Sequence, residues 1–304
     1  MAAGLNSEGR CAPITGTPPV INAMSVDVED YYQVYAFSER IKRADWDAWP
    51  SRVEANTERV LDVFDSAGVK ATFFTLGWVA ERHKALLRRV VAEGHELASH
   101  GYEHVRADSQ TPGEFRADVR RSKAILEDTG GVRVRGYRAA TFSIGQHNLW
   151  AFEVLAEEGY VYSSSLYPIR HDYYGMPEAP RTPFRPQQTV DLVEFPIGTV
   201  RLGGRNFPCG GGGYFRLLPY HLSRTAIRRV NVQEERPSVF YFHPWEIDPG
   251  QPRLSNLPVK TALRHYSNLG RMEAKLRRLL SDFRWDRMDR VLERDEDGLE
   301  ANAA

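Results

Sequence analysis

The chain has 304 residues, of which 42% are hydrophobic, so it can bury the core of one large α/β domain, and its length would also accommodate two. Basic and acidic residues number 40 each, which leaves no net charge to attract nucleic acid or an anionic membrane. No apolar run approaches the ~18 residues that span a bilayer, and the N-terminus lacks the basic and apolar regions of a secretory signal. We therefore expect a cytoplasmic protein without a transmembrane segment. Cys11 lies in a polar tail far from Cys209, so no structural disulfide is expected.

Strand and helix patterns alternate in the first half of the chain. Residues 1–19 are rich in Gly, Pro, Ser and Thr and are expected to form a disordered arm. Hydrophobic patterns and helix stop signals then predict strands at 20–26, 70–76, 95–99, 134–141 and 160–166, with helices at 53–67, 78–93, 111–128 and 148–158. Because short connections join these strands through helices, the order predicts a parallel sheet with helices outside. Polar clusters follow the strands, where α/β barrels carry their active sites.

The regular alternation fades after residue 166. The segment 168–186, rich in Tyr, His, Arg and Pro, is expected to be a substrate-facing loop. The glycine run at 210–213 is expected to be a flexible turn, and it lacks the Gly-Lys-Ser/Thr of a phosphate-binding loop. The remaining patterns predict strands at 189–196 and 238–242, a helix at 218–230, and an amphipathic helix at 259–283 on the outside.

Two histidines, His100 and His104, follow the strand at 95–99. Imidazoles four residues apart can bind one divalent metal if the backbone between them makes a single helical turn. The same residues match the His-x-x-Glu-His motif of zinc proteases, in which Glu103 would be the general base. That motif needs both histidines inside a helix, whereas Gly101 directly follows the first one and a strand precedes it. A metal site at a strand end is therefore preferred to a protease, with Glu103 on a solvated loop.

Three carboxylates, Asp27, Glu29 and Asp30, end the first strand. Crowded carboxylates repel one another unless a cation neutralises one of them or one takes a proton, and the alternative is a helix cap or a solvated turn. A functional site would use one carboxylate on the metal and another as a base. Strand alternation places Asp27 and Glu29 on one side, and Asp30 reaches them only if the strand ends at Glu29. Two imidazoles and one carboxylate leave metal positions open, as in a catalytic site.

A cation and a third imidazole follow later strands. Arg138 would hold a catalytic carboxylate ionised and oriented if the two lie close together. His243, after the apolar run 240–242, suits the protonation of a leaving amine because its ordinary pKa is near neutral. Each of these residues alone is a weak indication of a site. Because all of them follow predicted strands, they indicate one site together.

In this order, the features resemble the polysaccharide deacetylase family (carbohydrate esterase family 4, the NodB homology domain) over about residues 20–250. Five stretches of the chain are similar to sequences of the subgroup that is associated with exopolysaccharide and exosortase gene clusters. They are 25–31, 94–101, 137–139, 212–216 and 242–246. The resemblance implies a distorted (β/α) barrel of about seven parallel strands over this range. The rest of the chain is expected to form a helical extension at 251–290, packed on the barrel, and a frayed tail at 291–304. It also implies metal-dependent hydrolysis of N-acetyl groups on amino sugars of a polysaccharide or its precursor.

The resemblance assigns roles by position, with a divalent metal, expected to be Zn²⁺, as cofactor and an N-acetylated oligo- or polysaccharide as partner. The residues and roles are Asp27 as catalytic base, Asp30 or Glu29 as metal carboxylate, His100 and His104 as metal imidazoles, Arg138 as the residue holding the base, and His243 as general acid. The family commonly has two adjacent aspartates where Asp27 and Asp30 are separated here, so the metal carboxylate stays open.

Further expectations concern the surroundings of the reaction. The aspartate that often supports the acid histidine has no clear match, and Asp172 is the candidate. An amide near Leu166 or Tyr167 would stabilise the oxyanion. Aromatic residues could stack on sugars or pack in the core: Tyr31, Tyr32, Trp78, Tyr167 and Trp245. Two other functions stay open, namely an amidohydrolase of small non-sugar amides on the same barrel and a catalytically silent carbohydrate-binding protein.

Overall fold

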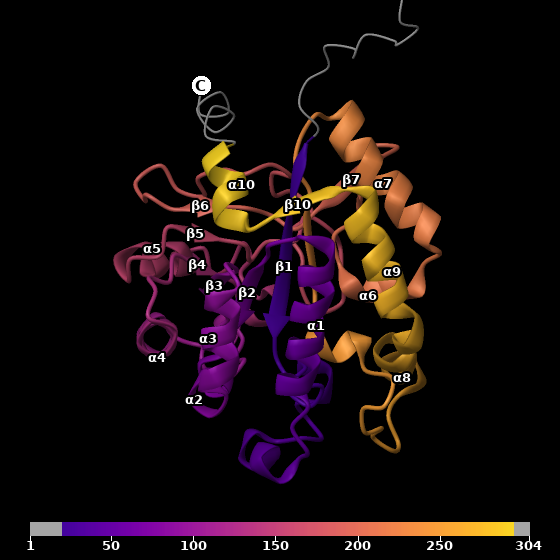
Figure 1. Ribbon diagram of the computed structural model, residues 1–304. Helices are drawn as coiled ribbons and strands as arrows, with labels where there is room; N and C mark the ends of the chain where they lie inside the picture. The colour runs from indigo at the N-terminus through magenta and orange to yellow at the C-terminus, as the bar shows by residue number, and fades with distance from the viewer. Residues whose placement is uncertain (1–19, 295–304) are drawn as a thin grey trace, which may run out of the picture.

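A curled parallel sheet forms the centre of the protein, as a computed structural model that describes residues 20–294 shows (Figure 1). Its strands lie in the order β9-β1-β2-β3-β4-β5-β6, and every pairing among them is parallel. They are β1 (Ile21–Val28), β2 (Thr72–Thr75), β3 (Glu96–Ser99), β4 (Gly136–Tyr137), β5 (Tyr162–Ser163), β6 (Val193–Glu194) and β9 (Val239–Phe242). The predicted distorted barrel of about seven parallel strands is confirmed.

Between strands β6 and β9, the barrel is closed by irregular backbone segments and not by a further strand. Phe195 donates its amide hydrogen to Ser163, 2.8 Å away, and Gly198 donates to Val239, 3.0 Å away. Tyr241 in turn donates to Gly210, at 2.7 Å. The barrel is therefore distorted on this side, because single backbone hydrogen bonds replace a regular strand ladder.

Helices cover the outside of the first half of the sheet, as the alternation predicts. They are α1 (Val53–Ala67), α2 (Gly77–Arg82), α3 (Lys84–Ala92), α4 (Pro112–Gly130) and α5 (Trp150–Glu157). Thr111 and Glu114 form a capping box at the start of α4, which satisfies amides that the helix leaves free. The helix predicted at 78–93 is instead two helices, because the backbone of His83 is not helical, with φ −123° and ψ 52°.

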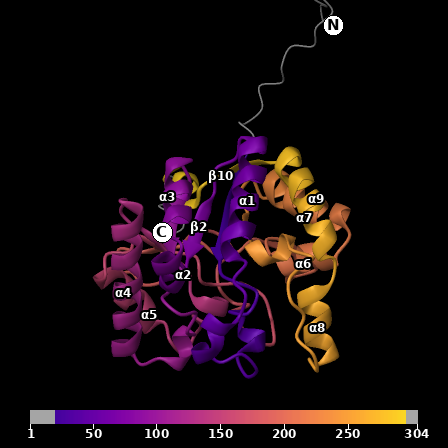
Figure 2. The same ribbon diagram turned by 60° about the horizontal axis from the view of Figure 1, so that its bottom comes forward.

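The C-terminal part adds helices beside the β9 edge, opposite α3–α5 (Figure 2). It comprises the antiparallel hairpin β7 (Thr199–Leu202) and β8 (Arg205–Pro208), the helices α6 (Gly212–Leu217), α7 (Tyr220–Gln233), α8 (Val259–Tyr266), α9 (Leu269–Asp282) and α10 (Met288–Arg294), and β10 (Arg284–Asp286). The helix expected at 259–283 is broken by Asn268, whose φ is +59°. No helix within residues 20–294 is both long and apolar enough to cross a membrane.

The last described segment joins the central sheet, which the sequence analysis did not predict. Strand β10 pairs in parallel with Ile21–Ala23 of β1. Helix α10 follows and buries Met288 completely, so residues 291–294 of the predicted frayed tail are helical. The predicted arm at 1–19 and the rest of that tail, 295–304, lie outside the described residues.

The glycine run 210–213 is tightly packed, so the expectation of a flexible turn is wrong for its first and third residues. A Cβ atom on Gly210 would lie 2.0 Å from the carbonyl oxygen of Val239. One on Gly212 would lie 2.6 Å from a carboxylate oxygen of Glu246. Only glycine lets this segment approach β9 so closely.

Candidate active site

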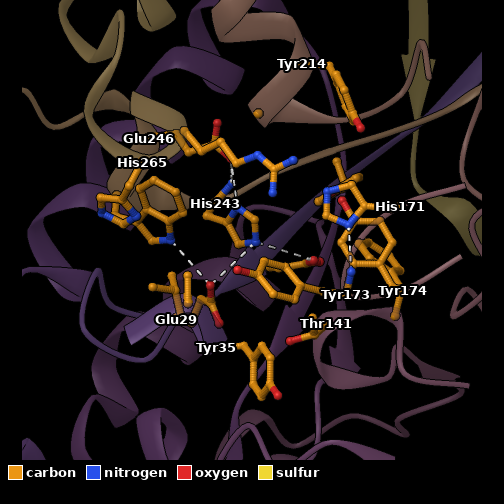
Figure 3. A pocket seen from close by; sticks show the side chains of 18 of the residues that line it. Glu29, Tyr35, Thr141, His171, Tyr173, Tyr174, Tyr214, His243, Glu246 and His265 are labelled. Carbon is orange, nitrogen blue, oxygen red and sulfur yellow. Dashed lines mark hydrogen bonds and ion pairs between the residues drawn. The ribbon is translucent and has the colours of Figure 1, made fainter. Parts of the chain in front are cut away.

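The predicted polar residues meet at the carboxyl ends of β1, β3, β4 and β9, where one cavity of about 230 Å³ opens (Figure 3). Asp27 is the next-to-last residue of β1, and Glu29 follows the strand. Both side chains are buried, and both line the cavity. Parallel strands deliver these groups to one edge of the sheet, as the sequence predicted.

The histidine pair lies on a loop, and the expected helical turn between His100 and His104 is wrong. The backbone takes positive φ at Gly101 (+76°) and at His104 (+57°), which turns the chain back toward the strand end. The two rings still lie close together, with centroids 5.2 Å apart and planes tilted by 60°. Glu103 points away from them and pairs with Arg43 at 3.0 Å, which agrees with the preference against a protease.

Glu29 completes a group of three potential metal ligands with His100 and His104. One ligand atom from each residue lies within 4.8 Å of the others, and the Glu29 carboxylate is 2.9 Å from Nε2 of His104. Nδ1 of His100 lies 2.8 Å from the carbonyl oxygen of Arg138, which leaves Nε2 for the cluster. Burial is the main cause that lowers the pKa of His100 to about 4, so its ring is neutral, as a metal ligand must be.

Asp30 does not join this group, which corrects the expectation that it could be the metal carboxylate. The chain turns directly after β1, and the Asp30 carboxylate accepts hydrogen bonds from the amides of Arg52 (2.7 Å) and Val53 (3.0 Å). Ser51 donates a third hydrogen bond, at 2.9 Å. Asp30 therefore caps the N-terminus of α1, which was the alternative for an acidic residue at this place.

Asp27 and Arg138 form a buried ion pair beside the histidines. A guanidinium nitrogen of Arg138 lies 2.6 Å from Oδ1 of Asp27. The guanidinium also donates to the carbonyl oxygen of Ser164 at 3.0 Å and lies over the ring of Phe74, 4.0 Å from its centroid. These contacts fix the cation, so Asp27 presents its other oxygen, Oδ2, in a defined direction.

His243 lines the cavity and lies between the carboxylates of Glu29 and Glu246 (Figure 3). Its Nε2 is 3.5 Å from Glu29 and 4.0 Å from Oδ2 of Asp27. Its Nδ1 is 2.7 Å from Glu246. Burial alone would lower the pKa of His243, but the charges of Glu29 and Glu246 outweigh it and raise the pKa to about 9. The ring therefore carries a proton at neutral pH.

Glu246, and not Asp172, supports His243. Asp172 lies at the surface, where it pairs with Lys260 at 2.6 Å. Glu246 is buried and is held by Arg216, whose Nε lies 2.7 Å from the second carboxylate oxygen. Arg216 and Glu246 carry no predicted role, although they lie in the stretches 212–216 and 242–246 that resemble the family subgroup, and the structure brings them together through this contact.

Arg216 in turn fastens the C-terminal helices to the site. Its guanidinium donates to the carbonyl oxygens of Arg264 (2.9 Å), His265 (3.0 Å) and Ser267 (2.7 Å). These three carbonyls lie at the end of α8, where the helix leaves them without intrahelical partners. The position of Glu246, which supports His243, thus depends on the end of α8 through Arg216.

Aromatic side chains form much of the cavity wall, but mostly not those expected to stack on sugars. Of those five, only Trp245 lines the cavity, and Tyr31, Tyr32, Trp78 and Tyr167 are buried elsewhere. The aromatic lining consists of Tyr35, Phe142, Tyr173, Tyr174, Tyr214, Tyr241 and Trp245. Tyr173 and Tyr174 come from the segment 168–186, which is expected to be a substrate-facing loop.

The expected oxyanion donor is also misplaced. The amide of Leu166 donates to the Glu194 carboxylate at 2.7 Å, and neither Leu166 nor Tyr167 lines the cavity. Thr141 does line it and has φ +56°, which is costly for a β-branched residue. Backbone strain at this place marks the loop after β4 as part of the site.

Comparisons with known proteins agree with this geometry. Residues 45–162 match the family model of polysaccharide deacetylases, and residues 164–293 match a domain of unknown function, DUF3473. A peptidoglycan-N-acetylglucosamine deacetylase of Bacillus cereus is 32% identical over 98 residues, which are 32% of this chain and 36% of the relative. A chitooligosaccharide deacetylase of Sinorhizobium fredii is 37% identical over 100 residues, which are 33% of this chain and 44% of the relative. The chain thus spans about two fifths of the length of these curated relatives.

A solved structure extends the likeness in fold. The crystal structure of a putative polysaccharide deacetylase from Mycobacterium smegmatis superposes with a TM-score of 0.60 at 21% identity and covers 95% of both chains. The fold therefore continues through both matched regions and includes β1, which precedes the first of them. The family match over residues 45–162, together with the named relatives, shows that this part of the chain belongs to the polysaccharide deacetylase family.

Proposed function

We propose that the protein is a metal-dependent N-deacetylase, which hydrolyses the acetamido group of an N-acetylated amino sugar in a polysaccharide or its precursor. One observation carries the proposal. A metal-type donor group, a carboxylate paired with arginine and a protonated imidazole face one cavity.

The residues present fit a divalent metal ion. Glu29, His100 and His104 would hold it, and the buried Oε2 atom of Glu29 lies 2.9 Å from Nε2 of His104, so the donor atoms already converge. Burial opposes ionisation of Glu29, but the charges of His104 and His243 lower its pKa to about 2, so the ligand oxygen is anionic. One carboxylate and two imidazoles are typical of Zn²⁺, which is the ion we propose. When bound, such an ion supplies Lewis acidity, which lowers the pKa of water and polarises a carbonyl group.

Asp27 is the proposed general base. Arg138 holds Oδ1, and Oδ2 is left to accept a proton from the attacking water. Asp27 is outside the group of potential metal ligands, so the base and the metal carboxylate are separate residues.

His243 is the proposed general acid. Its Nε2 faces the two site carboxylates, and its Nδ1 is held by Glu246. The proton on Nε2 would go to the sugar nitrogen as the amide C–N bond breaks, which releases acetate and a free amino sugar. Glu246 keeps the ring oriented for that transfer, so we assign it as a positioning residue.

Acetate release tests the proposal. Chito-oligosaccharides should yield acetate, the activity should disappear after dialysis against a chelator, and Zn²⁺ should restore it. Metal analysis of the protein as purified should find one ion per chain. Release of acyl groups from small non-sugar amides alone would replace the proposal by another amidohydrolase. Absence of both acetate and metal would favour a silent carbohydrate-binding protein.

A further inference from the structure

A second cavity, of about 1000 Å³, lies between the segment 168–182 and the β7–β8 hairpin. We call it the arginine cavity because five arginines and only two glutamates line it. The charged residues are Arg170, Arg181, Arg201, Arg205 and Arg236, with Glu178 and Glu234. All of them fall in the stretch that matches the domain of unknown function.

The inner part of the arginine cavity holds more positive than negative charge. Arg181 and Arg236 share the single carboxylate of Glu234, at 3.0 Å and 2.8 Å. The side chains of the two arginines are only 14% and 13% exposed. Arg181 also donates to Thr199, and Arg236 to the carbonyl oxygen of Arg181. Burial and the charge of Arg181 lower the pKa of Arg236, because the two guanidinium groups repel each other. An added anion would relieve this repulsion.

The rim adds arginines that have no acidic partner. Within residues 20–294, no carboxylate lies within 4.0 Å of the charged groups of Arg170, Arg201 or Arg205, and all three side chains are exposed. In the hairpin, Arg201 is opposite Asn206, so the two share a face. Asn206 donates to the carbonyl oxygen of Pro177 at 3.4 Å, which turns that face toward the segment 168–182.

The segment 168–182 also forms one wall of the active-site cavity. His171, Tyr173 and Tyr174 line the active-site cavity (Figure 3). Arg170 and Arg181, from the same segment, line the arginine cavity. The two cavities therefore share one wall, which makes the arginine cavity a neighbour of the active site.

We propose that the arginine cavity binds an anionic group, a carboxylate or a phosphate, carried by the saccharide whose acetamido sugar occupies the active site. Guanidinium groups bind both kinds of anion through paired, charge-assisted hydrogen bonds. The proposal rests on the proposed function, and it makes the substrate an anionic glycan or a saccharide phosphate. The part of the chain that matches no family of known function then has a role in substrate choice.

The test compares a neutral and an anionic substrate of equal length. Chito-oligosaccharides are neutral, whereas hyaluronan oligosaccharides alternate N-acetylglucosamine with glucuronate. The double variant Arg170→Ala/Arg201→Ala removes two exposed rim arginines, and Arg88→Ala/Arg133→Ala removes two exposed arginines from distant helices and turns as the control. For the anionic substrate, the rim variant should raise KM by at least about tenfold with kcat unchanged. The neutral substrate and the control variant should show no change.

Binding provides a readout that does not need catalysis. Calorimetry with hyaluronan oligosaccharides and with inorganic diphosphate distinguishes whether the cavity binds a carboxylate or a phosphate group. The rim variant should lose the binding that the wild type shows, and added NaCl should weaken it. Unchanged KM and unchanged binding of both anions in the rim variant would overturn the proposal. Anion binding by a wild type that releases no acetate would instead overturn only the proposed function and the link to its substrate.

Discussion

Asp27 has Oδ1 held by Arg138 and Oδ2 without a close partner among the described residues, and this asymmetry suits the proposed role of general base. Asp27→Asn keeps the shape of the side chain but cannot take a proton. We expect kcat for acetate release to fall by about two to four orders of magnitude, the usual range for a general base. Metal content should stay at the wild-type level, because Asp27 is not in the donor group. An Asp27→Asn protein with wild-type kcat would rule out this assignment.

In the proposed mechanism Glu246 acts on the reaction only through His243, so the effect of its replacement should depend on the leaving group. Glu246→Gln removes the negative charge at Nδ1, and kcat for the amide substrate should fall by about tenfold or more. An activated acetate ester needs no proton on its leaving group, so its hydrolysis should fall much less. The ratio of the two kcat values is the measurement, and Glu103→Gln, on the outer loop, is the control. Equal losses on both substrates would indicate a structural role.

The position of helix α6 depends on the absence of a side chain at its first residue, Gly212. Gly212, at its start, packs against the carboxylate of Glu246, whereas a Cβ on its neighbour Gly213 would meet nothing within 4 Å. Gly212→Ala should therefore push Glu246 away and cost about 1–3 kcal/mol of unfolding free energy, with a loss of activity. Gly213→Ala should be neutral or stabilising by up to about 1 kcal/mol, because alanine favours the helix. Chemical denaturation of both variants checks the pair, and equal stabilities would contradict this account of the glycine run.

At the scale of the whole molecule, the sequence predicted the elements better than the contacts between them. Strand ends and the histidine pair were predictable, because hydrophobic runs and polar residues after them are local signals. The choice of Glu29 over Asp30 depended on one backbone turn after β1, which no local pattern specifies. The support of His243 by Glu246 depended on Arg216, thirty residues away in the chain. Strand β10 is three residues long and carries no alternation that could reveal it.

The C-terminal segment is joined to the sheet by a buried acidic pair, which should make stability depend on pH. Glu96 of β3 accepts a hydrogen bond from the amide of Asp289 in α10, at 3.3 Å. Burial, together with the charge of Asp289, raises the pKa of Glu96 from 4.5 to about 7. The folded protein therefore holds this proton more tightly than the unfolded chain does. Its stabilising effect is fully present below about pH 4.5 and is lost as pH rises toward 7.

Glu96→Gln isolates this effect from other titrating groups, because the glutamine amide does not ionise. The variant should be more stable than the wild type at pH 8, where the wild type must either bury a charge or bind a proton. The difference in unfolding free energy should shrink as pH falls from 7 toward 4.5, and below that pH the wild-type carboxyl is protonated in both states. Denaturant titrations of both proteins across this range measure the difference. A difference that stays constant with pH would show that Glu96 does not titrate in this window, and that the junction between β3 and α10 tolerates its charge.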